Sequence, residues 1–172
     1  KAVMERLFAA LDPISDTSFC CVRFGNIAWS TGSVFTLWDR MTKVDSRIAT
    51  CGIGMRRFLF SVDSAVELVV AALENRASLR GSVLSIPMKS VEIADLVSVW
   101  CDLHGVHFEK LEPRTGDKTD EVLVGSLEVP STNNVVLSGL ECLKLDFNTT
   151  KNDSIQKEIN TFNADRLSTA EV

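Results

Sequence analysis

A short apolar run that ends in a glycine-rich polar loop is the feature that most limits how this chain can fold. The run at residues 18–24 predicts a buried strand, and Gly25-Asn26 interrupts it. A polar Gly/Ser loop follows, and an amphipathic stretch begins at Val34. A strand that leads through such a loop into a helix leaves backbone N–H groups free at the helix start, where a ligand can bind. A tight strand-to-helix connection that binds no ligand is the alternative, because Gly, Ser and Asn favour turns by themselves.

The composition is that of a folded domain with a sizeable core. The chain has 172 residues, of which 45% are hydrophobic. Its formal net charge of −5 argues against a protein that binds nucleic acid or anionic membranes over a wide surface, but leaves a compact anionic ligand open. The longest apolar stretch, residues 65–73, is too short to span a membrane and contains Glu67, and no signal peptide is visible. We therefore expect a soluble, cytoplasmic protein.

The cysteines and histidines predict neither a disulfide framework nor a metal site. Five cysteines are an odd number in no paired spacing, which favours reduced thiols. His104 and His107 flank Gly105 at the expected end of a helix, where histidines cap the helix or face water more often than they bind a metal.

Helical and strand patterns alternate along the chain and predict an α/β fold. Helices are expected at residues 2–11, 34–41, 63–75 and 90–104, and strands at residues 18–24, 82–86 and 106–111. Residues 64–67 have the spacing of a capping box. Residues 44–60 and 133–145 show no clear period. Residues 148–158 are polar and predict a linker, and residues 162–172 predict a turn followed by the start of a helix.

Two charged stretches add chemistry to the first loop. Met55-Arg56-Arg57-Phe58 places two guanidinium groups between apolar residues, and a planar guanidinium matches phosphate oxygens in a bidentate way. A solvated basic edge is the alternative, since most arginines are surface residues. Residues 112–121 gather charges around Gly116, which predicts a surface loop.

Three separated segments, taken in order, carry a resemblance that none of them carries alone. They are Arg23-Phe24-Gly25-Asn26 with Gly32-Ser33-Val34, then Met55-Arg56-Arg57-Phe58 with residues 61–66, then Arg114-Thr115-Gly116-Asp117-Lys118. Together they resemble the polysaccharide-biosynthesis branch of the extended short-chain dehydrogenase/reductase family. Residues 163–168 with Glu171 are similar to the C-terminal end of that branch.

The resemblance implies a fold class and a division into domains. The expected fold is α/β, the C-terminal portion of a Rossmann-type extended short-chain dehydrogenase with its smaller substrate-binding subdomain. Residues 1–32 and 61–105 would complete the Rossmann nucleotide-binding domain, residues 33–60 and 106–147 would bind the NDP-sugar, and residues 148–172 would form a truncated C-terminal extension. We therefore expect this chain to be the C-terminal half of an enzyme.

The activity that the resemblance implies is the modification of a nucleotide sugar. The best-known members of the branch are UDP-N-acetylglucosamine 4,6-dehydratases, some of which also epimerise at C5. They work by transient oxidation at sugar C4 with NADP, or NAD, as a tightly held cofactor. An NDP-sugar 4-epimerase and a truncated, non-catalytic nucleotide-sugar-binding relative are the alternatives. We expect a homo-oligomer for the complete enzyme and no nucleic acid partner.

Individual residues receive expected roles from the same resemblance. Lys1 aligns with the Lys of the family's Tyr-x-x-x-Lys catalytic pair, although an ordinary terminal lysine is the alternative. The expected cofactor-binding residues are Lys1, Arg23 and Gly25. The expected substrate-binding residues are Asn26, Ser33, Arg57, Arg114 and Asp117.

Within the substrate group, Asn26, Arg57 and Arg114 would contact the diphosphate, and Asp117 would lie near the nucleoside. Thr31 stands where the branch usually has an arginine. That departure removes a charge near the expected active site, so the identity of the sugar, and the activity itself, stay open at this point.

Overall fold

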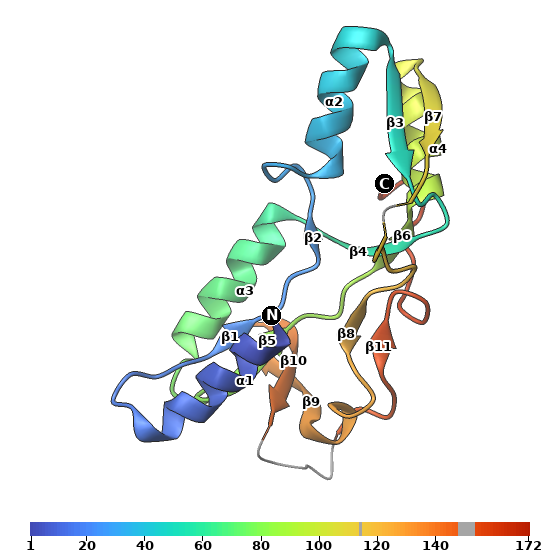
Figure 1. Ribbon diagram of the computed structural model, residues 1–172. Coiled ribbons are helices and arrows are strands. Elements are labelled where there is room, and N and C mark those ends of the chain that lie inside the picture. Colours follow the sequence, from blue (N-terminus) through green and yellow to red (C-terminus); the bar gives the residue numbers. More distant parts are fainter. Residues whose placement is uncertain (114, 148–153) are drawn as a thin grey trace. The chain divides into compact units, whose positions relative to one another are not determined.

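The chain divides into two units, each assembled from three separate segments. The computed structural model describes residues 1–113, 115–147 and 154–172 (Figure 1). Unit 1 consists of Lys1–Phe24, Asp63–Pro87 and Leu123–Ile159, and unit 2 consists of Gly25–Val62, Met88–Val122 and Asn160–Val172. Within the described ranges, no helix combines the length and the hydropathy that a membrane crossing requires.

Unit 1 is built on a mixed sheet with the strand order β1-β5-β10-β9. β1 (Cys21–Val22) runs parallel to β5 (Ser82–Ser85), and β10 (Leu140–Asp146) runs antiparallel both to β5 and to β9 (Thr132–Leu137). All four residues of β5 are buried, as expected of a strand that is paired on both edges inside a sheet. The short 3₁₀ turns Asp12–Ile14 and Val129–Ser131 also belong to this unit.

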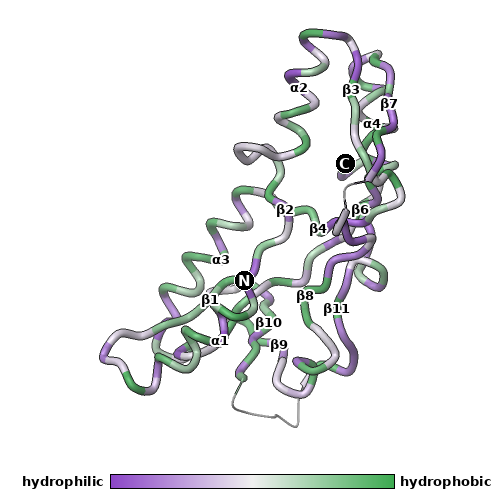
Figure 2. Tube along the Cα trace, in the orientation of Figure 1, coloured by the Kyte–Doolittle hydropathy of each residue, from purple (hydrophilic) through white to green (hydrophobic). Residues whose placement is uncertain are grey.

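Two helices of unit 1 keep much of their apolar surface exposed. α1 (Ala2–Leu11) and α3 (Val62–Glu74) bury mainly small residues and Leu68. Figure 2 shows hydrophobic positions along both helices. The exposed large apolar side chains are Val3, Met4 and Leu7 on α1, and Val62, Val66, Val69, Val70 and Leu73 on α3. The helix predicted at residues 2–11 is thus confirmed, and Val3, Met4 and Leu7 on it are exposed.

Unit 2 contains a three-stranded sheet and a separate pair of parallel strands. β4 (Arg56–Phe60) lies between β2 (Asn26–Ile27), which is parallel to it, and β6 (Ser90–Glu92), which is antiparallel. β3 (Arg47–Cys51) pairs in parallel with β7 (His107–Leu111). The helices of this unit are α2 (Val34–Asp45) and α4 (Ile93–His104). β8 (Val122–Val124) pairs with β11 (Ile159–Asn160), and this two-stranded sheet belongs to neither unit alone, because a unit boundary falls within each strand.

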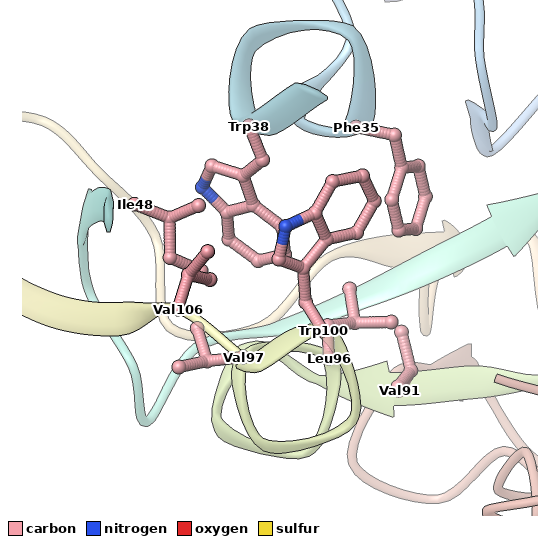
Figure 3. Packing of buried hydrophobic residues seen from close by; sticks show 8 residues of the cluster. All are labelled: Phe35, Trp38, Ile48, Val91, Leu96, Val97, Trp100 and Val106. Atoms are coloured by element: carbon pink, nitrogen blue, oxygen red, sulfur yellow. The ribbon is translucent and has the colours of Figure 1, made fainter. Parts of the chain in front are cut away.

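Aromatic side chains from α2 and α4 form the core of unit 2 (Figure 3). Trp38 on α2 is fully buried and meets Trp100 on α4 edge to face, with the ring centres 5.7 Å apart. The indole N–H of Trp100 donates to Oγ1 of Thr42 at 3.1 Å, so the polar atom of this large side chain is satisfied. Phe35 extends the cluster at the start of α2.

The C-terminal residues lie along β6. The amide of Ser90 donates to the carbonyl of Asp165 at 2.7 Å, and the amide of Leu167 donates to the carbonyl of Ser90 at 2.9 Å. The amide of Glu171 donates to the carbonyl of Ser168, and the carboxylate of Glu171 accepts from the Ser168 amide in return. The predicted helix start is therefore present as a capped turn.

The helices predicted from periodicity are confirmed, with some bounds corrected. The second helix extends to Asp45, and Gly105 ends α4 with a φ of 63°. The prediction that the last of these helices begins at residue 90 is wrong, because Ser90–Glu92 pairs with β4 as strand β6. α3 begins at Val62, so Ser64 lies inside its first turn and not at its cap.

The regions without a clear period contain strands. Residues 44–60 hold β3 and β4, and residues 133–145 fall within the β9–β10 hairpin. Ser138 and Gly139 form the hairpin turn with φ values of 50° and 83°, as a two-residue turn of the left-handed type requires. Conversely, of the strand predicted at residues 18–24, only Cys21–Val22 forms a β-strand, which is β1. Residues 148–153 of the predicted linker lie outside the described residues.

Candidate functional site

A pocket of about 320 Å³ opens in unit 2 where β2 ends and α2 begins. Its polar lining residues are Asn26, Ser30, Thr31, Ser33 and Arg57. Its apolar lining residues are Ile27, Ala28, Val34, Phe35, Leu59, Ile93 and Leu96, with Gly32 completing the wall. A concave site with apolar walls and a few polar groups is the usual form of a small-molecule site.

The loop of the pocket is fixed by hydrogen bonds of its own backbone. The amide of Ala28 donates to the carbonyl of Phe60 at 2.8 Å, which continues the pairing of β2 with β4. The amide of Ser33 donates to the carbonyl of Ser30, and Oγ of Ser33 accepts from the amide of Thr36 at the start of α2. The predicted passage from strand through loop to helix is therefore confirmed, and the N-terminus of α2 is part of the pocket wall.

Three of the predicted substrate-binding residues lie together in this pocket: Asn26, Ser33 and Arg57. Nη1 of Arg57 donates to the carbonyls of Arg56 at 2.7 Å and Lys118 at 3.0 Å, and its Nη2 lies 3.1 Å from Sδ of Met55. These contacts hold the guanidinium against the segment that follows Gly116.

Glu121 connects the polar residues of the pocket to that same segment. Its carboxylate accepts from Nδ2 of Asn26 at 3.0 and 3.2 Å and from the amide of Phe58 at 3.0 Å, and lies 3.8 Å from Nε of Arg57. The neighbouring Asp120 pairs with Arg56 at 3.0 Å. The two arginines of β4 thus face two consecutive carboxylates, so their charges are largely balanced.

The remaining predicted substrate-binding residues are Asp117 and Arg114. Asp117 lies in unit 2 but is not part of the pocket lining, and its carboxylate is 3.8 Å from Sγ of Cys51. Arg114 lies outside the residues that the structure describes. Their assignment to the substrate stays a prediction.

Gly25 occupies a position with no room for a side chain. A Cβ at this residue would lie 2.9 Å from both Cβ and O of Phe58 and 3.0 Å from Sδ of Met88. Glycine therefore allows β2 to pass close to β4. The predicted approach of a cofactor to this backbone stays a prediction.

The side chain of Arg23 is fully engaged within unit 1. Its guanidinium donates to the carboxylates of Glu5 and Glu128 and to the carbonyl of Leu123, over distances of 2.5 to 3.0 Å. Burial alone would raise the pKa of Glu128, but hydrogen bonds from Arg23 and from the amide of Gly125 outweigh it and lower that pKa. Arg23 thereby joins α1 to the segment after β8.

Lys1 directly precedes α1 in unit 1, and its side chain is exposed. The predicted cofactor and catalytic residues Lys1 and Arg23 thus belong to one unit, whereas Gly25 and the pocket belong to the other. The roles predicted for Lys1 and Arg23 stay predictions.

Sequence reasoning missed Glu121 and Trp29. Glu121 was part of a charged segment, and nothing in that segment signals that it meets Asn26, which lies far away in the chain. Trp29 has a φ of 62° and an exposed indole that stacks on Phe35 with ring centres 5.5 Å apart. In the sequence, only its position between the predicted strand and the glycine-rich loop could have indicated this unusual backbone angle.

Over the described part of the chain, no group of three or more His, Cys, Asp or Glu side chains is arranged to hold a metal ion.

The chain has the fold of a portion of a Rossmann-type extended short-chain dehydrogenase/reductase. The chain matches the structure of Pen from Bacillus thuringiensis with a TM-score of 0.87 and 22% identity, over 99% of this chain and 53% of that one. It also matches TunA, an NAD-dependent NDP-hexosamine 5,6-dehydratase of tunicamycin biosynthesis, with a TM-score of 0.59 and 16% identity, over 69% and 41% of the two chains. The predicted fold class is therefore confirmed.

The chain belongs to the polysaccharide biosynthesis protein family, whose model matches residues 1–136. It is 30% identical to the UDP-glucose 4-epimerase of Rickettsia felis over 140 residues, which cover 78% of this chain and 40% of the epimerase. An uncharacterized membrane protein of Methanocaldococcus jannaschii is 32% identical over 106 residues, 62% of this chain and 29% of that protein. The chain thus spans less than half the length of these curated relatives, and the predicted family is confirmed.

Proposed function

We propose that this chain supplies the substrate pocket of an NDP-sugar dehydratase or epimerase of polysaccharide biosynthesis that uses a nicotinamide cofactor. The observation that carries the proposal is the pocket that contains Asn26, Ser33 and Arg57 together. The family of the chain, the epimerase among its relatives and the dehydratase among its structural neighbours support it.

Arg57 is the residue that we assign to the diphosphate. It carries the positive charge among the lining residues, and a guanidinium binds phosphate oxygens through charge-assisted hydrogen bonds. Its Nη1 donates to the carbonyls of Arg56 and Lys118, whereas its Nη2 contacts the weak acceptor Sδ of Met55 and its Nε lies 3.8 Å from Glu121. We therefore expect the phosphate oxygens to bind at Nη2 and Nε. Arg114 and Asp117 complete the proposed nucleotide contacts.

We propose that Lys1 contacts the nicotinamide cofactor. An exposed ammonium group at the start of α1 can donate hydrogen bonds to ribose hydroxyls and lower the pKa of a neighbouring acid. Because the guanidinium of Arg23 is engaged with Glu5 and Glu128, we propose that Arg23 acts by holding α1 in place. A bound nicotinamide cofactor supplies reversible oxidation at sugar C4.

Among specific reactions we favour the UDP-N-acetylhexosamine 4,6-dehydratase, with or without 5-epimerisation. The alternative, a 4-epimerase, is favoured by the 30% identity to the Rickettsia felis enzyme. A non-catalytic relative that binds nucleotide sugar is the third candidate, because Thr31 brings no charge to the pocket.

Calorimetric titration of UDP-N-acetylglucosamine and of UDP tests the pocket. Arg57→Ala should make the binding free energy of both ligands less favourable by about 1.5–3 kcal/mol, because it removes a charge-assisted contact to phosphate. Arg47→Ala is the matched control, since Arg47 is an exposed arginine of the same unit that pairs with Glu109. Equal affinities for the wild type and Arg57→Ala would contradict the assignment.

NMR analysis of the product, with the full-length protein, UDP-N-acetylglucosamine and NADP, separates the reactions. A dehydratase forms a 4-keto sugar whose C6 has become a methyl group. An epimerase leaves the C6 hydroxyl in place and inverts C4. Binding without conversion would favour the non-catalytic candidate.

A further inference from the structure

Thr161 is a fully buried polar residue that holds two consecutive acidic residues in place. Its Oγ1 accepts a hydrogen bond from the amide of Glu121 at 2.9 Å and donates one to Oδ1 of Asp120 at 3.0 Å. Its own amide donates to the carbonyl of Glu121 at 2.9 Å. The backbone of Glu121 is therefore fixed from both sides by one buried side chain and its amide.

Residues 118–121 in turn lie alongside the start of β4. The carbonyl of Lys118 accepts from Nη1 of Arg57 at 3.0 Å, and the carboxylate of Glu121 accepts from the amide of Phe58 at 3.0 Å. One of these bonds orients the guanidinium of Arg57, and the other anchors the carboxylate beside it. The position of the arginine that we assign to the diphosphate thus depends on residues that Thr161 holds.

The carboxylate of Glu121 lies close to Arg57 without forming a hydrogen bond to it. Its Oε1 is 3.8 Å from Nε of Arg57, beyond the usual range of an N–H···O bond. A carboxylate that moved closer would form a charge-assisted pair with the guanidinium and would compete with phosphate for the same donors. The observed distance balances part of the charge of Arg57 and leaves Nε to a ligand.

We propose that Thr161 is a positioning residue for Arg57: by holding Glu121, it keeps the carboxylate from pairing with the guanidinium and leaves Arg57 to phosphate. The inference rests on the proposed function and adds a residue that lies outside the pocket lining. Thr161 touches no ligand and acts through residues 118–121. A guanidinium that is ordered before binding loses less side-chain entropy when phosphate binds, so the fixed arrangement should strengthen binding.

The test measures the affinity of the full-length protein for inorganic pyrophosphate and for UDP-N-acetylglucosamine by calorimetric titration. Thr161→Val keeps the size of the side chain and removes its oxygen. It should weaken both ligands about fivefold, less than Arg57→Ala does, because the guanidinium is displaced and not removed. Thr161→Ser keeps the oxygen, so both affinities should stay within about twofold of the wild type.

A double-mutant cycle separates this role from a general loss of stability. In an Arg57→Ala background, Thr161→Val should change the affinity for pyrophosphate by less than about twofold, because the side chain through which it acts is gone. Thr132→Val is the matched control, since Thr132 is also buried and its Oγ1 donates to the carbonyl of Glu128 at 2.8 Å in unit 1. It should lower the melting temperature and leave the affinity for pyrophosphate unchanged.

Two outcomes would overturn the inference while the proposed function stands. One is a folded Thr161→Val protein with wild-type affinity for pyrophosphate. The other is an equal effect of Thr161→Val with and without the side chain of Arg57. If Thr161→Val does not fold, Thr161→Cys replaces it, because a thiol forms weaker hydrogen bonds than a hydroxyl, and the same two outcomes apply.

The proposed function fails in a different way. A wild-type protein that binds neither pyrophosphate nor UDP-N-acetylglucosamine would remove the proposed function, and the inference with it.

Discussion

Gly25 is a residue whose identity follows from the distance between two strands. An added Cβ would lie within 3.0 Å of three atoms, two of which belong to Phe58 on β4. Gly25→Ala should lower the free energy of unfolding by about 1–3 kcal/mol, as overpacking usually does. Urea unfolding followed by circular dichroism measures it. Gly54→Ala is the control, because among the described residues, its own chain neighbours aside, no heavy atom lies within 4 Å of a Cβ there. Equal transition midpoints for the two variants would contradict the packing argument.

Arg23 illustrates how one cation holds two carboxylates. In Arg23→Met, Glu5 and Glu128 would face each other partly buried and without their partner, so we expect a loss of stability on the order of 3 kcal/mol at pH 7. Urea unfolding of the variant measures the loss. Arg47→Met removes an exposed pair and should cost less than about 1 kcal/mol.

The same network makes stability depend on pH in a defined direction. The folded-state pKa of Glu128 is lowered from its ordinary value of 4.5, so its contribution is complete above that value and is lost as the pH falls through the folded-state pKa. The wild type should therefore lose more stability on acidification below pH 4.5 than Arg23→Met does. Parallel losses in both proteins would contradict this account.

Among the elements, α2 and α4 depend on each other through Trp38. This side chain is fully buried between Trp100 and Ile48 in the core of unit 2 (Figure 3). Trp38→Ala should cost about 3–5 kcal/mol, measured by chemical unfolding. Leu37→Ala, one residue earlier on the same helix, removes a half-exposed side chain and should cost much less. A similar cost for both would show that Trp38 is not the contact that joins the helices.

The elements also show which parts of the fold the sequence could predict. Helices such as α2 and α4 repeat their apolar face over several turns, so that each carries its own periodic signal. β3 has no such signal, because its five residues are stabilised by β7, more than fifty positions later in the chain. β6 was mistaken for the first turn of α4 because its three residues are too few to show the period of two that marks a strand.

Some residues of the candidate site could likewise be predicted from the sequence, and others could not. Asn26, Ser33 and Arg57 were predictable because they stand in segments whose order resembles one family. Glu121 was not, because its role arises from contacts with Asn26 and Phe58 that only the folded chain creates. Trp29 likewise owes its position to a stack with Phe35.

At the scale of the whole molecule, the exposed side chains of α3 should limit solubility. Val66, Val70 and Leu73 form an apolar stripe at helical spacing, and stripes of this kind promote aggregation when nothing covers them. The chain of residues 1–172 expressed alone should therefore self-associate. Replacing all three residues by glutamine should raise the concentration at which light scattering appears. Leu103→Gln, at an exposed site on α4, is the control, and an equal gain from it would contradict the role of the stripe.

The hydrogen bonds of Thr161 connect the C-terminal segment to the residues beside the pocket. This residue is fully buried, and it accepts from the amide of Glu121 and donates to Asp120, so the docking of residues 160–172 and the arrangement of the pocket share one set of bonds. Two events that share an intermediate set of contacts are linked, and the linkage is reciprocal. We therefore expect a ligand that stabilises this arrangement of the pocket to strengthen the docking of residues 160–172, and detachment of that segment to weaken ligand binding by the same factor.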